Sequence, residues 1–384
     1  EVGNINIGDF PSLGLYGAAT YNGIPTLGFT QAGNDQLKWE TSKKSNIGLA
    51  LSFLKDRITL EADYYNNKVD GLILDAKQAP SKGIPGNVIS ANVGSLYNKG
   101  FEFALTAAII QKDDFKWNAN FNISTLQNKV TTLFNGTDIY APSNFGIQNM
   151  TREGYSIGSI WAVPTNGVNP ANGNRIFINR NGQQVQYNHI AANKWTYLDG
   201  SVAPAIDNYL DGRIQGSSLP TYYGGLNNNF SYKRFDFDFG IIFSGGNKIY
   251  NGTRANLLDQ RYFNNGTFVL DRWTTPGQVT DIPKLYFSDN VSTGFSITNS
   301  AMVEDGSFLK LKNVALGYCL PAQKLFNGRI SSLRIYAQAT NLFTITNYSG
   351  SDPEISINGN SIASGKDHNA VVNARTFALG LNLQ

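Results

Sequence analysis

Disulfides, transmembrane helices and strong net charge are all missing from this sequence. A single cysteine, Cys319, excludes an internal disulfide, and we interpret it as a small strand residue. No stretch approaches the roughly 18 consecutive apolar residues of a transmembrane helix. The net charge is only +3, from 31 basic and 28 acidic residues, and no basic run with interleaved aromatic residues occurs. A helical membrane protein is therefore excluded, and no nucleic-acid partner is expected.

Histidine is also scarce, which limits the catalytic and metal chemistry. The two histidines, His189 and His368, lie in polar, loop-like sequence, and neither has partners at the spacing of a nucleophilic or zinc site. Residues 169–174 have the turn-forming, oxygen-rich spacing of a calcium loop, but their asparagines carry no charge that would favour the ion. We therefore predict that the protein is not an enzyme and has no catalytic residue, cofactor or metal site.

What the sequence does contain is strict alternation of apolar and polar residues. In the first such segment, Ile47, Leu49, Leu51 and Phe53 alternate with glycine, alanine and serine. Because successive side chains of a strand point to opposite faces, each segment has one apolar and one polar side, as a lipid-facing exterior and a water-filled interior require. We predict nine strands, most of which follow this pattern: 47–53, 58–65, 101–109, 117–124, 226–232, 235–243, 308–319, 333–340 and 377–383.

The lengths of the connections discriminate between β architectures. Short turns follow the first, third, fifth and seventh segments, whereas long polar loops follow the others, including 70–97 and 129–221. Bacterial outer-membrane barrels have short periplasmic turns and long extracellular loops, but soluble sandwiches and propellers do not place every long loop at one end. We therefore predict an all-β fold, a transmembrane antiparallel β-barrel wall of nine strands.

Nine is an odd number, so the two ends of the chain lie on opposite sides of the membrane. With the C-terminus at the short-turn end, residues 1–36 form an extracellular segment and residues 37–384 form the strands and loops. An open edge in lipid would leave backbone groups unpaired at several kcal/mol each. We therefore expect the remaining strands to come from a missing or separate N-terminal portion.

Short motifs along the chain add a family resemblance. They are Asn98-Lys99-Gly100-Phe101-Glu102, Glu153-Gly154-Tyr155 and Asp352-Pro353-Glu354, with further motifs in 37–49, 63–65, 92–95, 157–158, 223–230, 305–318 and 333–343. Each motif alone is weak evidence, but together they occur in order, with barrel spacing, over nearly the whole chain. The sequence resembles the barrel of SusC-like (SusC/RagA-type) TonB-dependent outer-membrane transporters of Bacteroidetes.

The resemblance implies energised import of a large nutrient, an oligosaccharide or a peptide, across the outer membrane of a Gram-negative, Bacteroidetes-type bacterium. The barrel would have about 22 strands, of which residues 1–384 supply about the last nine. The implied partners are a SusD-like lipoprotein lid, a plug domain and further barrel strands that are absent from this chain, TonB acting through the plug, the glycan or peptide ligand, and the lipid and lipopolysaccharide of the bilayer. Family barrels usually end on an aromatic residue, so we expect a phenylalanine after Gln384.

Aromatic residues in the long loops are the candidate ligand contacts. They are Trp161, Trp195, Tyr209, Tyr250, Tyr262 and Trp273. No lipid face requires large rings in these loops, and such rings stack on sugar faces or pack against peptide side chains. The alternative interpretation is that the rings form small hydrophobic clusters that keep the loops compact, or that they dock against the lid.

Two other functions remain open from the residues alone. A passive porin-like channel would need no plug, no TonB and no lid. A soluble β-sandwich carbohydrate-binding module would bury the apolar rows in a core, and it would be soluble without detergent. The outward row of Phe235, Phe237, Phe239, Ile241 and Phe243 argues against the sandwich.

Overall fold

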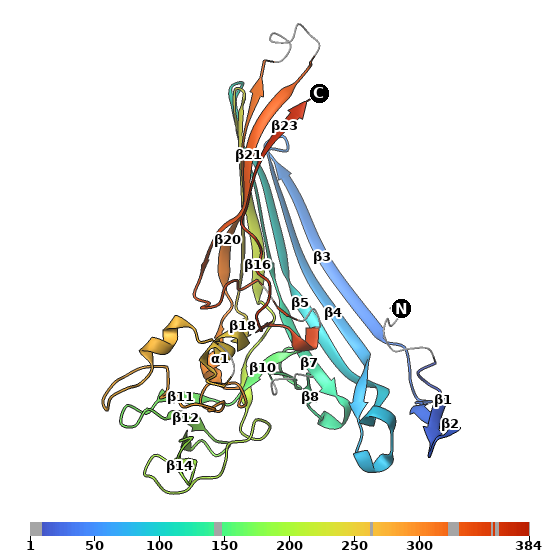
Figure 1. The fold of residues 1–384 in the computed structure, drawn as a ribbon. Coiled ribbons are helices and arrows are strands. Elements are labelled where there is room, and N and C mark those ends of the chain that lie inside the picture. The colour runs from blue at the N-terminus through green and yellow to red at the C-terminus, as the bar shows by residue number, and fades with distance from the viewer. Residues whose placement is uncertain are drawn as a thin grey trace.

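One long antiparallel sheet dominates the computed structural model, which describes residues 10–141, 148–261, 264–321, 330–354, 356–357 and 361–383 (Figure 1). Nine strands cross this sheet in chain order, and each pairs antiparallel with the next. They are β3 (Thr41–Phe53), β4 (Ile58–Lys77), β5 (Val88–Gln111), β6 (Phe115–Thr125), β16 (Tyr222–Tyr232), β17 (Phe235–Gly245), β20 (Phe308–Leu320), β21 (Leu333–Thr346) and β23 (Thr376–Leu383). The predicted nine-stranded order is confirmed.

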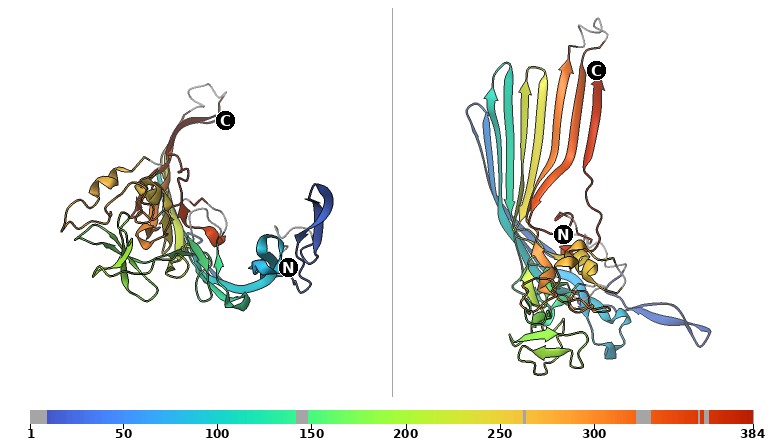
Figure 2. Two further views of the ribbon diagram at one scale, coloured as in Figure 1. Left: turned by 60° about the horizontal axis from the view of Figure 1, so that its bottom comes forward. Right: turned by 60° about the vertical axis from the view of Figure 1, so that its left-hand side comes forward.

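The sheet is a curved, open wall whose edge strands are β3 and β23 (Figure 2). A tenth strand, β7 (Gln127–Leu133), continues the line of β6 along the far part of β5. Each of these edges carries a row of backbone groups that no described strand of the wall pairs. In the part of the chain that the structure describes, no helix is both long and apolar enough to cross a membrane.

The two faces of the wall differ as the alternation predicts. On β23 the outward side chains of Phe377, Leu379 and Leu381 are each more than two-thirds exposed. On the opposite face, Arg334 of β21 binds Asp236 of β17 through two hydrogen bonds, across the intervening strand β20. A soluble protein rarely leaves such a continuous apolar face in water, whereas a barrel exterior requires one. This arrangement does not fit the soluble sandwich.

The tight turns lie at one end of the wall, and the β3–β4 turn is strained. Leu54, Lys55 and Asp56 all adopt left-handed φ values of 54°, 59° and 63°. A left-handed conformation costs a non-glycine residue about 1–2 kcal/mol, so the turn needs compensation. The Ser52 hydroxyl donates to the Asp56 carboxylate at 2.6 Å, and the Arg57 guanidinium donates to backbone carbonyls of β5.

A bulge in β20 changes which residues face lipid. The sequence has apolar residues at Leu309 and Leu311 and then at Val314 and Leu316, so strict alternation breaks at residues 312 and 313. The pairing of β20 with both neighbours shifts register at this point. One extra residue in the strand returns the later apolar side chains to the outer face. The predicted strand over 308–319 is confirmed, and the bulge lies within it.

The expected loop at 70–97 is wrong in extent. Strand β4 runs on to Lys77 and β5 begins at Val88, so only residues 78–87 connect them, with the 3₁₀ turns η1 (Pro80–Lys82) and η2 (Pro85–Asn87). The pairing contains register shifts around Gly71, whose φ is 70°. Register shifts of this kind interrupt the two-residue alternation, so the strand pattern is not continuous through this part of the sequence.

The three longer connections fold into small sheets at the end of the wall opposite the tight turns (Figure 1). The first sheet contains β8 (Ile139–Tyr140), β9 (Asn149–Thr151), β10 (Ser159–Ala162) and β15 (Arg213–Gly216), and the second contains β11 (Thr165–Val168), β12 (Arg175–Ile178), β13 (Gln184–Tyr187) and β14 (Trp195–Tyr197). The third joins β18 (Lys248–Asn251), β19 (Val303–Asp305) and β22 (Lys366–Asp367). These strands of two to four residues are too short to show a periodic pattern in the sequence.

Short helices complete this folded end, which we call the loop domain. They are α1 (Gly252–Leu258), η3 (Phe134–Gly136), η4 (Thr267–Asp271), η5 (Ser300–Met302) and η6 (Ser361–Ala363). Before the wall begins, β1 (Leu15–Tyr21) and β2 (Ile24–Gln31) form a separate hairpin around Asn22 and Gly23. Both turn residues have positive φ, the geometry of an Asn-Gly hairpin turn.

Candidate functional site

The described aromatic residues among the predicted ligand contacts belong to the loop domain, but they do not form one site. Trp161, Trp195 and Tyr250 pack in three different hydrophobic clusters. Tyr209 and Trp161 both contact the ring of Tyr140, Trp273 belongs to none of these clusters, and Tyr262 is outside the described residues. Each ring therefore has its own surroundings.

Trp161 on β10 is a packing residue, with 3% of its surface exposed. Its indole N–H donates to the carbonyl of Asn208 at 2.8 Å, and the Arg152 guanidinium lies 5.1 Å from the ring. The absence of a side chain at Gly212 permits this position, because a Cβ there would lie 2.2 Å from the indole nitrogen. Hydrogen-bonded and covered, Trp161 supports the loop rather than offering a stacking face.

Tyr209 presents an accessible ring. It is 57% exposed, and its ring centroid lies 5.1 Å from that of Tyr140, with an interplanar angle of 73°. Burial, followed by the nearby Asp138 carboxylate, raises the pKa of Tyr140. Arg152 pairs with Asp138 alongside. Tyr209 therefore offers a largely exposed ring that is supported by a T-shaped contact with Tyr140.

Trp195 on β14 is half-buried in a row of rings. It meets Tyr187 at 4.7 Å and Phe177 at 5.6 Å between ring centroids. The Tyr187 hydroxyl lies 3.2 Å from Nδ1 of His189, and burial raises the pKa of Tyr187. The row continues from His189 to Tyr286, with their ring centroids 6.4 Å apart.

Tyr250 and Trp273 are both buried. The Tyr250 hydroxyl donates to the carbonyl of Gly294 at 2.8 Å, and burial raises its pKa. The Trp273 indole N–H donates to the carbonyl of Pro170 at 2.9 Å. Gly173 has a φ of 79° and packs directly on this indole, since a Cβ there would lie 2.5 Å from two ring carbons. In this conformation neither ring offers a face to a ligand.

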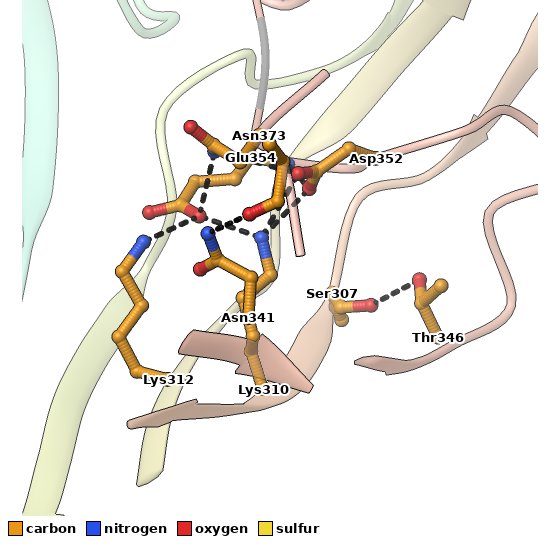
Figure 3. A network of polar contacts seen from close by, with 9 residues as sticks. Ser307, Lys310, Lys312, Asn341, Thr346, Asp352, Glu354 and Asn373 are labelled. Carbon is orange, nitrogen blue, oxygen red and sulfur yellow. Dashed lines mark hydrogen bonds and ion pairs between the residues drawn. The ribbon is translucent and has the colours of Figure 1, made fainter. Parts of the chain in front are cut away.

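A buried ion network joins the wall to the last long connection, residues 347–375 (Figure 3). Lys310 on β20 is 1% exposed, and its ammonium donates to Asp352 at 2.9 and 3.0 Å and to Glu354 at 2.6 Å. Lys312 lies 3.4 Å from Glu354, and the Asn373 amide lies 3.4 Å from both carboxylates. A buried cation of this kind requires paired, hydrogen-bonded anions, which the connection supplies.

The same connection is tied to residues 246–307 by a second network. Glu304 accepts hydrogen bonds from the backbone and the hydroxyl of Ser349, both at 2.7 Å, and from Asn251 at 2.9 Å. Asp367 on β22 accepts from Thr253 and Tyr348, both at 2.8 Å. Residues 347–375 therefore hold the loop domain together and to the wall.

These networks were missed by sequence reasoning about function. Asp352 and Glu354 were part of a family motif, and Lys310 and Lys312 were part of another, but nothing local shows that the two motifs meet. Among the described residues, no group of three or more His, Cys, Asp or Glu side chains could hold a metal ion. In the predicted oxygen-rich turn, the side-chain oxygens of Asn169 and Asn172 accept backbone N–H groups within the turn itself.

Comparison with known proteins agrees with this architecture. A family model described as TonB dependent receptor-like, beta-barrel matches residues 9–203. A TonB-dependent receptor of Formosa agariphila is 31% identical over 402 residues, and the TonB-dependent receptor SusC of Bacteroides thetaiotaomicron is 30% identical over 408 residues. Each alignment covers 100% of this chain. A solved structure of the RagAB peptide transporter matches 99% of the chain at 26% identity, with a TM-score of 0.77.

The matches also define how much of a relative this chain represents. It spans 38% of the Formosa receptor, 36% of SusC and 39% of the matched RagAB chain. The family model covers half of the chain, and the curated relatives cover all of it. The chain belongs to the TonB-dependent receptor β-barrel family, among its SusC-like members.

Proposed function

We propose that this chain is part of an importer that takes a large nutrient, an oligosaccharide or a peptide, across the outer membrane. The observation that carries the proposal is a nine-stranded wall with its folded connections at one end, in a chain of the SusC-like family. In this proposal a plug domain and further strands complete the barrel, and TonB acts through the plug. The solved relative is a peptide transporter, which supports a peptide ligand, while exposed rings would serve a glycan equally well.

The cellular setting follows in part from the family. A TonB-dependent receptor barrel lies in the outer membrane, and the curated relatives are receptors rather than enzymes. We propose a Bacteroidetes-type host because those relatives come from Formosa and Bacteroides. We also propose that residues 1–36 are extracellular, since β1 and β2 lie at the same end of the wall as the loop domain (Figure 1).

A SusD-like lipoprotein is the proposed partner at this end. Exposed apolar side chains of the loop domain support a docking surface, since Leu210, Leu270, Val279 and Phe287 are all more than half exposed. The β1–β2 hairpin adds apolar surface, and residues 10–34 contain no charged residue. Two-stranded hairpins are marginally stable alone in water, so a contact that covers this one would stabilise it.

Two rings are the ligand contacts that we propose from the aromatic set. Tyr209 offers an open face supported by Tyr140, and Trp195 is half-exposed beside Tyr187. The buried rings would act indirectly, by keeping the loop domain rigid around the ligand. Tyr262 remains a candidate on its sequence position alone.

Uptake by the full-length protein in its native host tests this function. We expect import of fluorescently labelled peptides or oligosaccharides to require the gene, TonB and the lipoprotein encoded with it. Tyr209→Ala should lower ligand affinity severalfold, whereas Tyr155→Ala, at another exposed tyrosine of the same long connection, should not. Uptake that continues in a strain without TonB would overturn the importer and favour a passive channel.

A further inference from the structure

A cavity of about 260 Å³ in the loop domain has the chemistry of a small binding site. It lies between helix α1, the turn η4 and residues 349–351, and it is lined by Arg254, Thr253, Ser349, Ser351, Leu257 and Phe268. One wall therefore carries a guanidinium and hydroxyl groups, and another carries apolar side chains. Drug-sized ligands occupy about 300–1,000 Å³, so this cavity suits one terminal unit of a longer ligand.

The Arg254 guanidinium is only weakly neutralised. Its one ionic contact among the described residues is to Oε1 of Glu304, at 3.4 Å, and its ring contact is to Phe268, 5.8 Å from the ring centroid. The Glu304 oxygens already accept three shorter hydrogen bonds from Ser349 and Asn251. A guanidinium has five N–H donors, so most of those on Arg254 are available to a ligand.

A buried cation outside the cavity lining, Arg175, also interacts with Arg254. Arg175 is 1% exposed, its Nε donates to the carbonyl of Ser292 at 3.3 Å, and its Nη2 is buried without a hydrogen-bond partner in the described structure. Burial, followed by repulsion from Arg254, lowers the pKa of Arg175 to about 10. The two guanidinium groups therefore repel each other, and an anion bound at Arg254 would relieve that repulsion.

We infer that this cavity binds a carboxylate group carried on a small, partly apolar unit. Arginine presents a planar pair of donors that matches a carboxylate, and the Ser351 hydroxyl lies in the same cavity to donate a further hydrogen bond. Leu257 and Phe268 would pack against an alkyl side chain or the C–H face of a sugar. The unit is the C-terminal residue of a peptide or a uronic acid of a glycan, so the inference rests on the proposed import function.

Binding of small probes to the full-length transporter, purified with its lipoprotein partner, tests the inference. N-acetyl-leucine compared with its amide represents the peptide source, and galacturonate compared with galactose represents the sugar source. We expect calorimetry to show that, in at least one of the two pairs, the carboxylate binds more tightly than its neutral analogue. The pair that shows this preference identifies the source of the carboxylate. Arg254→Gln should lower that affinity at least about tenfold, because it removes a charge-assisted hydrogen bond.

Two further variants separate binding from a structural role. Arg254→Lys keeps the charge without the planar donors and should retain part of the affinity. Arg272→Gln, outside the cavity, should leave the affinity unchanged. Co-purification of the partner would show that each variant is folded.

The outcomes distinguish the site from the function. Equal binding of acids and neutral analogues, or an Arg254→Gln affinity equal to that of the wild type, overturns the carboxylate site even when nutrient uptake is intact. Carboxylate binding that depends on Arg254, in a protein that transports nothing, would support the site and overturn the importer.

Discussion

Replacing Lys310 by methionine removes the cation that links β20 to residues 347–375. The ammonium side chain is 2% exposed and Asp352 is 8% exposed, whereas Glu354 is 32% exposed. Methionine has a similar length but no charge, so the packing volume is largely kept. The variant therefore leaves Asp352 as a nearly buried carboxylate whose ammonium partner is gone.

The magnitude follows from burial. Removing one partner of a buried ion pair costs about 3–5 kcal/mol, because the remaining charge stays desolvated. Lys312 and Asn373 still approach Glu354 at 3.4 Å, and Glu354 can turn to water, so we expect the lower value. About 3 kcal/mol corresponds to a roughly 150-fold larger fraction of molecules with this connection undocked.

Limited proteolysis of outer-membrane preparations measures that fraction. When docking is fast relative to cleavage, the cleavage rate follows the open population, so Lys310→Met should be cut within 347–375 far faster than the wild type. Lys312→Met is the matched control, because this lysine is 38% exposed and surface pairs contribute about 0–1 kcal/mol.

A double variant tests whether the unpaired carboxylate of Asp352 causes the destabilisation. Lys310→Met combined with Asp352→Leu removes both buried charges, and apolar replacement of a whole buried pair is often neutral. We expect the double variant to be cut more slowly than Lys310→Met alone. Equal cleavage of Lys310→Met and the wild type would refute the argument, and so would equal effects of the Lys310 and Lys312 variants.

Three further predictions follow from other parts of the molecule. Gly173→Ala places a Cβ 2.5 Å from the Trp273 ring at a φ of 79°, so it should lower the free energy of opening of the loop domain by more than about 1 kcal/mol. Gly154→Ala, at a φ of 88° with open space around it, should show the backbone cost alone. Hydrogen exchange measures both effects. Burial lowers the pKa of Lys366 from 10.5 to about 8. Between pH 8 and 10.5 the docked strand β22 therefore holds a neutral Lys366 while the undocked one is charged, so docking should strengthen as the pH rises through this range. Lys366→Met should abolish this dependence, as measured by hydrogen exchange corrected for pH. Leu379→Lys, on the outer face of β23, should destabilise the barrel by about 2–4 kcal/mol and lower the amount of heat-resistant barrel on a gel. Ala378→Lys, on the inner face, should not. Equal loss in the two variants would show that the faces are wrongly assigned.

The fold was predictable because its signal is local. Alternation with a period of two, as in Phe377, Leu379 and Leu381, reports which face of a strand meets lipid without any knowledge of its neighbours. The pattern failed where the register shifts around Gly71 interrupt the alternation, so the parts of β4 and β5 beyond this point were assigned to a loop. It also did not reveal the bulge at Lys312, although the break in alternation between Leu311 and Val314 marks its position.

The candidate site was less predictable because ring type alone does not report exposure. Trp161 and Tyr209 are both aromatic residues of one polar connection, yet one is 3% exposed and the other 57%. The difference arises from what covers each ring, and for Trp161 that includes the side chain of Arg152 and the absence of one at Gly212. Such contacts depend on how the small sheets pack.

The sequence by itself determined the number of wall strands, their order and their lipid-facing sides, because period-two patterning and connection length are properties of neighbouring residues. Tertiary structure alone decided which loop residues are buried, which charges pair and where a cavity forms. Lys310 and Asp352 are 42 residues apart, and Arg254 and Glu304 are 50 apart. No local pattern joins such pairs, since their contact exists only once the connections have folded onto the wall.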